Sequence, residues 1–481
     1  MLTAYSIGIL AYFIALKTGS EFHETVKVII AFSAFILCMY FAYKRRYSDL
    51  TIMIIILGFI GFEVPEFLYI PRMRIEDLIL LTIIPLILVL DKSLNLKTNR
   101  LILYLLMLTT AVYVSTTTGH LSDIVPFNIR DYFVALHFTK LAIFALFVNS
   151  IKWSEQQVWL AIKVIIICSS IASIIALGQS FNNSLALELS KAYYITTEWH
   201  MEGIGELGRQ SGTVSNANTF ARILSISFAF LFSCIIVLRG KKAYIYSCML
   251  IIVAGIIVTG SRSVLFSLPV VFVIGILHSQ KRLKILKLFL FIIMLSLPIF
   301  YIFTYLKART PILDTMNEII RDPYSSGSFR WRWGYSINVA LELFNKSPFF
   351  GVGPGKGLGY PTDSEYYYVL SRYGIIGSIA FALLYIDIIF RSYKYSRDTI
   401  LLRINNAHSI YALSVMLFTI GFLVSNIGGA ILTSHQVLAN LYIVILSIFY
   451  SFSSKVEGEK ILLKGAFNSI PASHALRAGK K

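Results

Sequence analysis

Long apolar runs separated by short polar segments make up most of the 481-residue chain. A helix needs about 20 mostly apolar residues to cross a bilayer, and fourteen segments meet or approach this length. They are residues 2–16, 26–43, 50–64, 76–90, 101–117, 131–149, 157–178, 216–238, 243–259, 262–279, 285–304, 365–390, 408–428 and 433–453. The pattern predicts an all-α polytopic membrane protein with about fourteen transmembrane helices, within a range of twelve to fourteen.

Two long polar segments divide these helices into groups. The predicted organisation is as follows: N-terminal transmembrane helices in 1–178, a first long loop in 179–215, central helices in 216–304, a large loop in 305–364, C-terminal helices in 365–453 and a basic tail in 454–481. Within the large loop, Trp333, Ile337, Leu341 and Phe344 recur at intervals of three or four residues, which predicts an amphipathic helix that ends before Pro348. The loop before the last three spans is therefore expected to be partly helical.

The distribution of basic residues orients the chain. With the N-terminus inside, the short inner loops contain eighteen Lys and Arg residues and the short outer loops contain six. Cytoplasmic loops of membrane proteins carry an excess of such residues. We therefore predict that both termini are cytoplasmic and that the loops 179–215 and 305–364 lie outside, where a site is to be sought.

Composition supports the membrane class and removes several others. The chain is 57% hydrophobic and 14% charged, with a mean hydropathy of +0.72, whereas soluble domains contain roughly 25% charged residues. The net charge of +18 is explained by basic cytoplasmic loops, so no nucleic-acid partner is expected. The four cysteines lie in apolar runs without metal-ligand spacing, and the N-terminal run lacks a cleavage site, which favours a retained span.

A glycine-rich stretch at 351–377 raises the possibility of a nucleotide site. A P-loop with Lys356 as its lysine needs Gly at 350 and Ser or Thr at 357, but the chain has Phe350 and Gly357. The dinucleotide pattern fails too, because the five glycines from 351 to 359 occupy only odd positions. We therefore exclude nucleotide binding, and we expect the glycines to allow an irregular backbone.

The segment after these glycines resembles the start of a helix. Thr362-Asp363-Ser364-Glu365 fits a capping box, in which Thr362 and Glu365 satisfy the first backbone N–H groups. Asp363 is not needed for that role. It is either a general base or a favourable charge at a helix N-terminus.

Two further polar clusters precede predicted helices at the same face. They are Gly208–Asn218, which contains Arg209, and Gly260–Ser263, which contains Arg262. Helix N-termini suit phosphate groups, and Arg adds bidentate contacts to phosphate oxygens. Lipid phosphates for Arg262 and solvent for Arg209 are the alternatives. The convergence of the clusters favours an anion site.

Aromatic and ionisable residues add candidates. Arg330, Trp331, Arg332 and Trp333 form either a sugar platform with a cation or an interfacial anchor. Ionisable residues within or near spans are costly in lipid, so each is expected to have a partner or a function; they are Lys140, Lys163, Arg222, Arg372 and Asp387. Arg222 lies near enough to the start of its span to reach the predicted outer site.

Taken in order, three motifs resemble a known family. "GRQSGTVSNANTFARIL", "TGSRSVLFSLPVV" and "RWRWGYSINVALELFNKSPFFGVGPG", the last followed by "DSEYYYVLSRYGIIGSIAF", are similar to the bacterial O-antigen polymerase and ligase superfamily (Wzy and WaaL). The resemblance covers about residues 205–385. The remaining chain matches only as hydrophobic topology.

The resemblance implies glycosyl transfer at the periplasmic face of the bacterial inner membrane. The donor would be a glycan on an undecaprenyl diphosphate carrier, with no cofactor, no nucleotide sugar and no metal. A bilayer and a chain-length-regulating membrane protein would be the partners.

Roles for individual residues follow from the resemblance. The expected diphosphate ligands are Arg209, Arg222, Arg262, Arg330 and Arg332, with Arg262 also acting in catalysis. Asp363 or Glu365 would deprotonate the acceptor hydroxyl. The expected glycan contacts are Trp331, Trp333, Tyr366 and Tyr367.

Three other functions compete with a Wzy-type polymerase. Ligases of this superfamily typically have a His-Asn pair where this chain has Asp363-Ser364, which disfavours transfer of the glycan to a lipid A-core acceptor. A flippase for lipid-linked sugars would need cations along a path to both faces, whereas the arginine motifs gather at one. The glycan polymerases of cell shape and division have fewer spans, and their motifs are not evident.

Overall fold

The computed structural model describes eleven segments of the chain. These are residues 20–60, 63–64, 73–193, 209–214, 216–238, 243–279, 335–355, 364–402, 406–428, 432 and 438–453, with side chains placed from residue 29 onward in the first of them. The predicted spans at 2–16 and 285–304 and the predicted tail lie outside the described residues.

Helices account for nearly all of the described chain. They are α2 (Ser20–Tyr43), α3 (Tyr47–Ile60), α4 (Ile75–Leu90), α5 (Arg100–Leu121), α6 (Arg130–Ser150), α7 (Glu155–Ser180), α8 (Ser184–Tyr193), α10 (Ala217–Val237), α11 (Ala243–Val258), α12 (Arg262–His278), α16 (Ile337–Lys346), α17 (Glu365–Leu402), α18 (Asn406–Ser425), the short 3-10 helix η3 (Asn426–Gly428) and a final helix, Leu438–Ser453.

These helices confirm a polytopic helical membrane protein. Six of them are long and apolar enough to cross a bilayer, and shorter apolar helices accompany them. Twelve of the fourteen predicted spans coincide with a helix in the described residues, so the number fourteen stays a prediction. A two-residue antiparallel pair of β1 (Glu63–Val64) and β2 (Met73–Arg74) departs from the all-α expectation and from the predicted span at 50–64.

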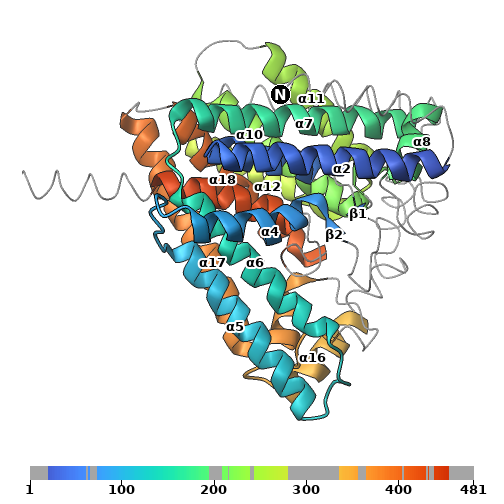
Figure 1. Cartoon of the computed structure of the whole chain (residues 1–481), viewed down its shortest axis with the longest axis vertical. Coiled ribbons are helices and arrows are strands. Elements are labelled where there is room, and N and C mark those ends of the chain that lie inside the picture. Colours follow the sequence, from blue (N-terminus) through green and yellow to red (C-terminus); the bar gives the residue numbers. More distant parts are fainter. Residues whose placement is uncertain are drawn as a thin grey trace, which may run out of the picture.

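The helices form two groups that share one region of contact. Figure 1 shows α2, α7, α10, α11, α12 and α18 lying side by side, while α5, α6, α16 and α17 diverge from them toward a separate tip. The packing of α17 against α18 joins the groups. Helix α10 is central, because 89% of its span is buried, whereas only half of the α5 span is buried.

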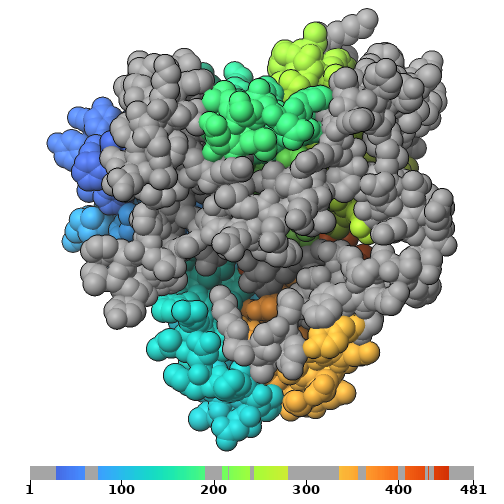
Figure 2. Space-filling model, turned by 90° about the vertical axis from the view of Figure 1, so that its right-hand side faces the viewer, coloured from blue at the N-terminus to red at the C-terminus, as the bar shows by residue number. Residues whose placement is uncertain are grey.

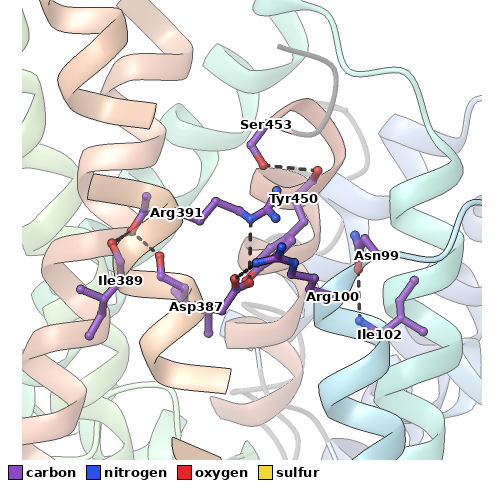
Figure 3. A network of polar contacts seen from close by, with 10 residues as sticks. Asn99, Arg100, Ile102, Asp387, Ile389, Arg391, Tyr450 and Ser453 are labelled. Carbon is purple, nitrogen blue, oxygen red and sulfur yellow. Dashed lines mark hydrogen bonds and ion pairs between the residues drawn. The ribbon is translucent and has the colours of Figure 1, made fainter. Parts of the chain in front are cut away.

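Alternating helix directions give the bundle two ends. We call the end where α10, α12 and α17 begin, and where α7, α11 and α18 finish, the Arg262 end. The other is the Asp387 end. There Arg100 Nη1 donates to Asp387 Oδ1 at 3.1 Å and the Tyr450 hydroxyl donates to Oδ2 at 2.6 Å. Figure 3 shows Arg391 beside the same carboxylate, with its Nε 3.8 Å from Oδ2. This network gives Asp387 the partner expected of an ionisable residue in a span.

A second buried ionic group lies within the bundle. Lys140 of α6 donates to Asp77 Oδ1 of α4, and Asn440 Nδ2 of the final helix donates to the same oxygen at 2.9 Å. Arg74 Nη1 lies 3.7 Å from Glu76 Oε1. Because charge is expensive away from water, the pairing explains how Lys140 is accommodated.

The amphipathic helix predicted in the large loop exists as α16, but it buries a different face. Ala340 and Leu343 are buried, while Leu341 of the predicted apolar stripe is 42% exposed. Leu343 packs with Val125, from the turn between α5 and α6, and with Val352. The buried face is therefore set by these tertiary contacts and not by the helical stripe alone.

Candidate functional site

The segment 209–214 lies against the turn between α11 and α12 at the Arg262 end. The Gln210 N–H donates to the Val258 carbonyl at 3.1 Å, and Arg209 Nε donates to the Thr259 carbonyl at 3.2 Å. Arg262 begins α12 three residues after Thr259. Two arginines that are distant in sequence, Arg209 and Arg262, are therefore brought to one corner of the bundle.

A tight turn fixes the path of this segment. Gly212 has a φ of +58°, and a Cβ added there would lie 2.4 Å from the Phe220 ring. Gln179, near the end of α7, donates from Nε2 to the Gly212 carbonyl at 3.0 Å and accepts from its N–H at 3.1 Å. The amide of Gln179 thus satisfies both backbone groups of a glycine that no side chain could replace without movement.

The first turn of α10 orients Arg209. Asn216 is the N-cap, and its side chain accepts from the N–H groups of Asn218 and Thr219 at 2.8 and 3.2 Å. The Asn218 side chain is then available to Arg209, whose Nη2 donates to its Oδ1 at 2.5 Å. Of the two asparagines in the sequence motif, Asn216 therefore caps the helix and Asn218 orients the Arg209 guanidinium.

The start of α12 combines a sharp turn with a buried N-cap residue. Gly260 has a φ of +63°, which allows the chain to reverse between the two helices. Ser261 occupies the N-cap position, is fully buried, and makes no side-chain capping bond. Arg262 follows it and is partly exposed. The turn predicted between two apolar spans is confirmed, with the arginine at the first helical position.

Arg222 lies deeper than the other two arginines. Its side chain is fully buried, and Nη2 donates to the Ser425 carbonyl at 3.4 Å. That carbonyl belongs to the last residue of α18, where the helix dipole is negative and favours a cation. Arg222 therefore connects the corner that holds Arg209 and Arg262, called the arginine corner below, to the end of α18.

The start of α17 reaches the same end of α18. The Tyr366 hydroxyl donates to the Leu423 carbonyl, two residues before the carbonyl that accepts from Arg222. Glu365 is fully buried, and its Oε1 accepts from the Leu432 N–H at 2.7 Å. The arginine corner and the α17 N-terminus thus meet around the last turn of α18, which brings Glu365 and Tyr366 toward Arg222.

Several buried hydroxyls in this region have no hydrogen-bond partner among the described residues. They are the side chains of Ser211, Thr213, Thr219 and Ser261. A buried hydroxyl without a partner is costly, and in native structures such groups call for an explanation. These buried hydroxyls lie in or beside the segments that carry Arg209 and Arg262, so this corner of the bundle is rich in hydrogen-bonding groups as well as cations.

Some predicted site residues lie outside the described residues: Asp363, Arg330, Trp331, Arg332 and Trp333. Tyr366 and Tyr367 are described, with Tyr366 37% exposed and Tyr367 partly buried. Sequence reasoning missed Gln179, Leu423, Ser425 and Leu432. Gln179 is a polar residue near the end of an apolar helix, which is a weak signal, and the other three contribute only backbone groups, which leave no signal in the sequence.

Within the part of the chain that the structure describes, no group of three or more His, Cys, Asp or Glu side chains could hold a metal ion. The assembled groups are cations, hydroxyls, amides and one buried carboxylate. Such a set can bind a polyanion, polarise a leaving group and orient a hydroxyl.

The fold and site define a helical membrane protein with a cationic, hydroxyl-rich cluster at one end of its bundle. Residues 247–411 match the protein-family model described as O-Antigen ligase. The match supports the O-antigen polymerase and ligase superfamily predicted from the motifs, whose members are membrane enzymes that transfer glycosyl groups. It includes Arg262 and Glu365, whereas Arg209 and Arg222 precede it. No curated protein matches the chain.

Proposed function

We propose that this protein polymerises undecaprenyl-diphosphate-linked oligosaccharide repeat units into O-antigen or another surface polysaccharide, at the periplasmic face of the bacterial inner membrane. The observation that carries the proposal is the convergence of Arg209 and Arg262 beside four buried hydroxyls. The family match supports glycosyl transfer as the reaction class. A membrane protein that regulates chain length is the proposed partner.

The reaction assigns a charge-stabilising role to the arginines. A hydroxyl oxygen of the acceptor repeat unit attacks the anomeric carbon of the growing chain, and the bond from that carbon to the carrier diphosphate breaks. The electron pair leaves with the diphosphate, so negative charge develops on it. Arg209 and Arg262 stabilise that charge, and Arg222, which lies deeper in the bundle, adds to the positive potential.

The released proton needs an acceptor near the attacking hydroxyl. Glu365, the first residue of α17, and Asp363, two residues earlier in the sequence, are the candidates for this general base. Glu365 is already oriented, because one of its carboxylate oxygens accepts the Leu432 N–H. Tyr366 and Tyr367 follow on the same turn, where they can contact the glycan, together with Trp331 and Trp333 of the large loop.

A ligase that transfers the glycan to a lipid A-core acceptor is the second candidate, since the matched family model carries that description. The two reactions share the donor and the leaving group, so the arginine corner serves both. The Asp363-Ser364 pair, in place of the His-Asn pair typical of ligases, favours the polymerase. The gathering of Arg209, Arg222 and Arg262 at one end disfavours a flippase.

The test is the surface polysaccharide ladder of a deletion strain complemented with variants. Arg262→Ala and Arg209→Ala should reduce polymer by about 10²- to 10³-fold at unchanged protein level, as expected for loss of a group that stabilises transition-state charge. Lys at either position should restore only part of the polymer, because an ammonium group cannot make the bidentate contact of a guanidinium with phosphate oxygens. Arg46→Ala is the matched control, since this exposed arginine pairs with Asp49 at the other end of the bundle.

The pattern of products separates the candidates. A strain that keeps single repeat units attached to lipid A-core, but makes no ladder, identifies a polymerase; a strain that accumulates lipid-linked polymer identifies a ligase. A normal ladder from Arg262→Ala at normal protein level would overturn the role given to this arginine. Accumulation of lipid-linked repeat units in the inner leaflet after deletion would instead identify a flippase.

A further inference from the structure

Helix α17 is broken about a quarter of the way along, at Gly374. Gly374 has φ +63° and ψ −164°, a conformation that is essentially restricted to glycine. The break separates a short helix, residues 365–373, from the long remainder. In a continuous helix the N–H groups of Ile375 and Ile376 would donate to residues 371 and 372. They donate instead to the carbonyls of Pro348 and Phe349, at 2.9 and 3.2 Å.

The glycine-rich segment 347–355 completes the pairing at this break. The Arg372 carbonyl, which would have accepted from Ile376, accepts from the Gly353 N–H at 2.9 Å. Three backbone hydrogen bonds therefore connect the segment to both sides of the break. Broken helices persist at membrane depth only where protein or water satisfies the freed backbone groups, and here the segment does so.

The glycines are required by contact distance. A Cβ on Gly351 would lie 2.3 Å from the Arg372 carbonyl oxygen, and one on Gly374 would lie 2.5 Å from the Phe349 oxygen. A Cβ on Gly353 would lie 2.7 Å from Thr116 Cα of α5. All three glycines have φ between +63° and +79°. The opposing atoms belong to backbone, so no side-chain rotation could relieve these collisions.

The far side of the segment is also held. Val352 packs with Val125 and Leu343, which come from the α5–α6 turn and from α16. Figure 2 shows the α5 and α6 region (cyan) at the lower tip of the molecule and the α16 region (orange) beside it. A Cβ on Gly119 of α5 would lie 2.1 Å from the Val352 carbonyl oxygen, so α5 and the segment are in direct backbone contact. The segment is thus wedged between α5 and the broken helix.

We propose that segment 347–355 is a positioning element that splints the break in α17 and thereby holds the short helix 365–373, with Glu365 and Tyr366, at the site. The inference rests on the proposed function. The short helix is held at its first turn by Leu423 and Leu432, and at its last residues by the splint.

The consequence is that the glycines act through the residues at the other end of the short helix. They do not touch the proposed substrate, so they are positioning residues. A group displaced by about 1 Å from its productive position can lose about 10²-fold in rate. The short helix spans about two and a half turns of hydrogen-bonded backbone, so we expect a shift at residue 373 to move residue 365.

The test compares purified full-length variants in nanodiscs by amide hydrogen exchange and by elongation of an undecaprenyl-diphosphate-linked oligosaccharide. Gly351→Ala and Gly374→Ala should speed exchange in residues 364–376 and leave α10 unchanged. Maximal turnover should fall by about 100-fold, while the donor concentration for half-maximal rate changes little, because the arginine corner is intact. Gly58→Ala is the matched control, since its Cβ would meet nothing within 4 Å.

A second variant covers the case in which the glycine variants do not fold. Val352→Ala introduces no collision and only loosens the wedge, so it should change exchange and turnover in the same direction by a smaller factor. Folded glycine variants with turnover within about twofold of wild type would overturn the proposal, as would slower turnover without faster exchange in 364–376. A wild-type protein that elongates nothing overturns the proposed function, while the exchange comparison still decides whether the segment splints α17.

Discussion

The buried pair of Lys140 and Asp77 offers the sharpest test of how this bundle is held together. Both side chains are 5% exposed, and Asp77 accepts hydrogen bonds from Lys140 and from Asn440 at once. Removing one member of a buried pair leaves an uncompensated charge and costs about 3–5 kcal/mol. Because Asn440 still donates to Asp77 after Lys140→Met, we expect a cost at the lower end, about 3 kcal/mol.

The unfolding assay can use the protein's own cysteines. Cys38, Cys168 and Cys234 are buried, so a thiol-reactive dye reports unfolding of the detergent-solubilised protein. At roughly 2 °C per kcal/mol for a large domain, Lys140→Met should lower the midpoint by about 6 °C. Lys163→Met on α7 is the matched control, because this lysine also lies in a span but is exposed, and it should change the midpoint by less than about 1 °C.

A double replacement distinguishes pairing from packing. Lys140→Met combined with Asp77→Leu removes both charges, and such replacements are often neutral or stabilising. The double variant should therefore be more stable than Lys140→Met alone. If the two changes instead add, with each lowering the midpoint by its full single-variant amount, the two residues are not energetically coupled and the reasoning from the buried pair is refuted.

Three further predictions concern the ends of the bundle. Gly212→Ala should move the 209–214 segment away from Phe220 and lower polymer formation more than protein level, at an overpacking cost of about 1–3 kcal/mol; equal losses of both would contradict a local effect. Gln179→Leu should remove the two hydrogen bonds that its amide makes with the Gly212 backbone and cost about 0.5–1.5 kcal/mol for each bond, whereas Gln157→Leu at the other end of α7 is the comparison in the same thermal assay. Hydrogen bonds from Ser93 hold the pKa of Asp91, at the end of α4, at about 2, below the ordinary 3.8. Its stabilisation is present above pH 3.8 and is lost as the pH falls through about 2, so the midpoint difference between wild type and Asp91→Asn should disappear in acid; a difference that persists at about pH 2 argues against an ionised Asp91.

The apolar pattern predicted the helices well, because each span is a local property of about 20 residues. The turn between α11 and α12 was predicted for the same reason, since Gly260 and a polar triplet interrupt two apolar runs. The amphipathic stripe of α16 was less informative. Leu341 is exposed because the packing of Leu343 against Val125 sets which face of α16 is buried. Val125 lies in a turn more than 200 residues earlier in the chain.

The sequence alone determined the membrane class, the position of most helices, the exclusion of a nucleotide cradle at 351–359 and the arginine motifs that resemble a glycosyl-transferring family. Only the tertiary structure decided the partners: Lys140 with Asp77, 63 residues apart, and Arg222 with Ser425, 203 residues apart. It also decided what the glycines lie against, because the backbone of Gly351 and Gly353 contacts the break in α17 at Gly374. The physical reason is that nearly every residue carries the same backbone carbonyl and N–H groups. A hydrogen bond between distant main-chain groups therefore leaves almost no signal in the sequence. The exception is the glycines, which allow the two backbones to approach each other.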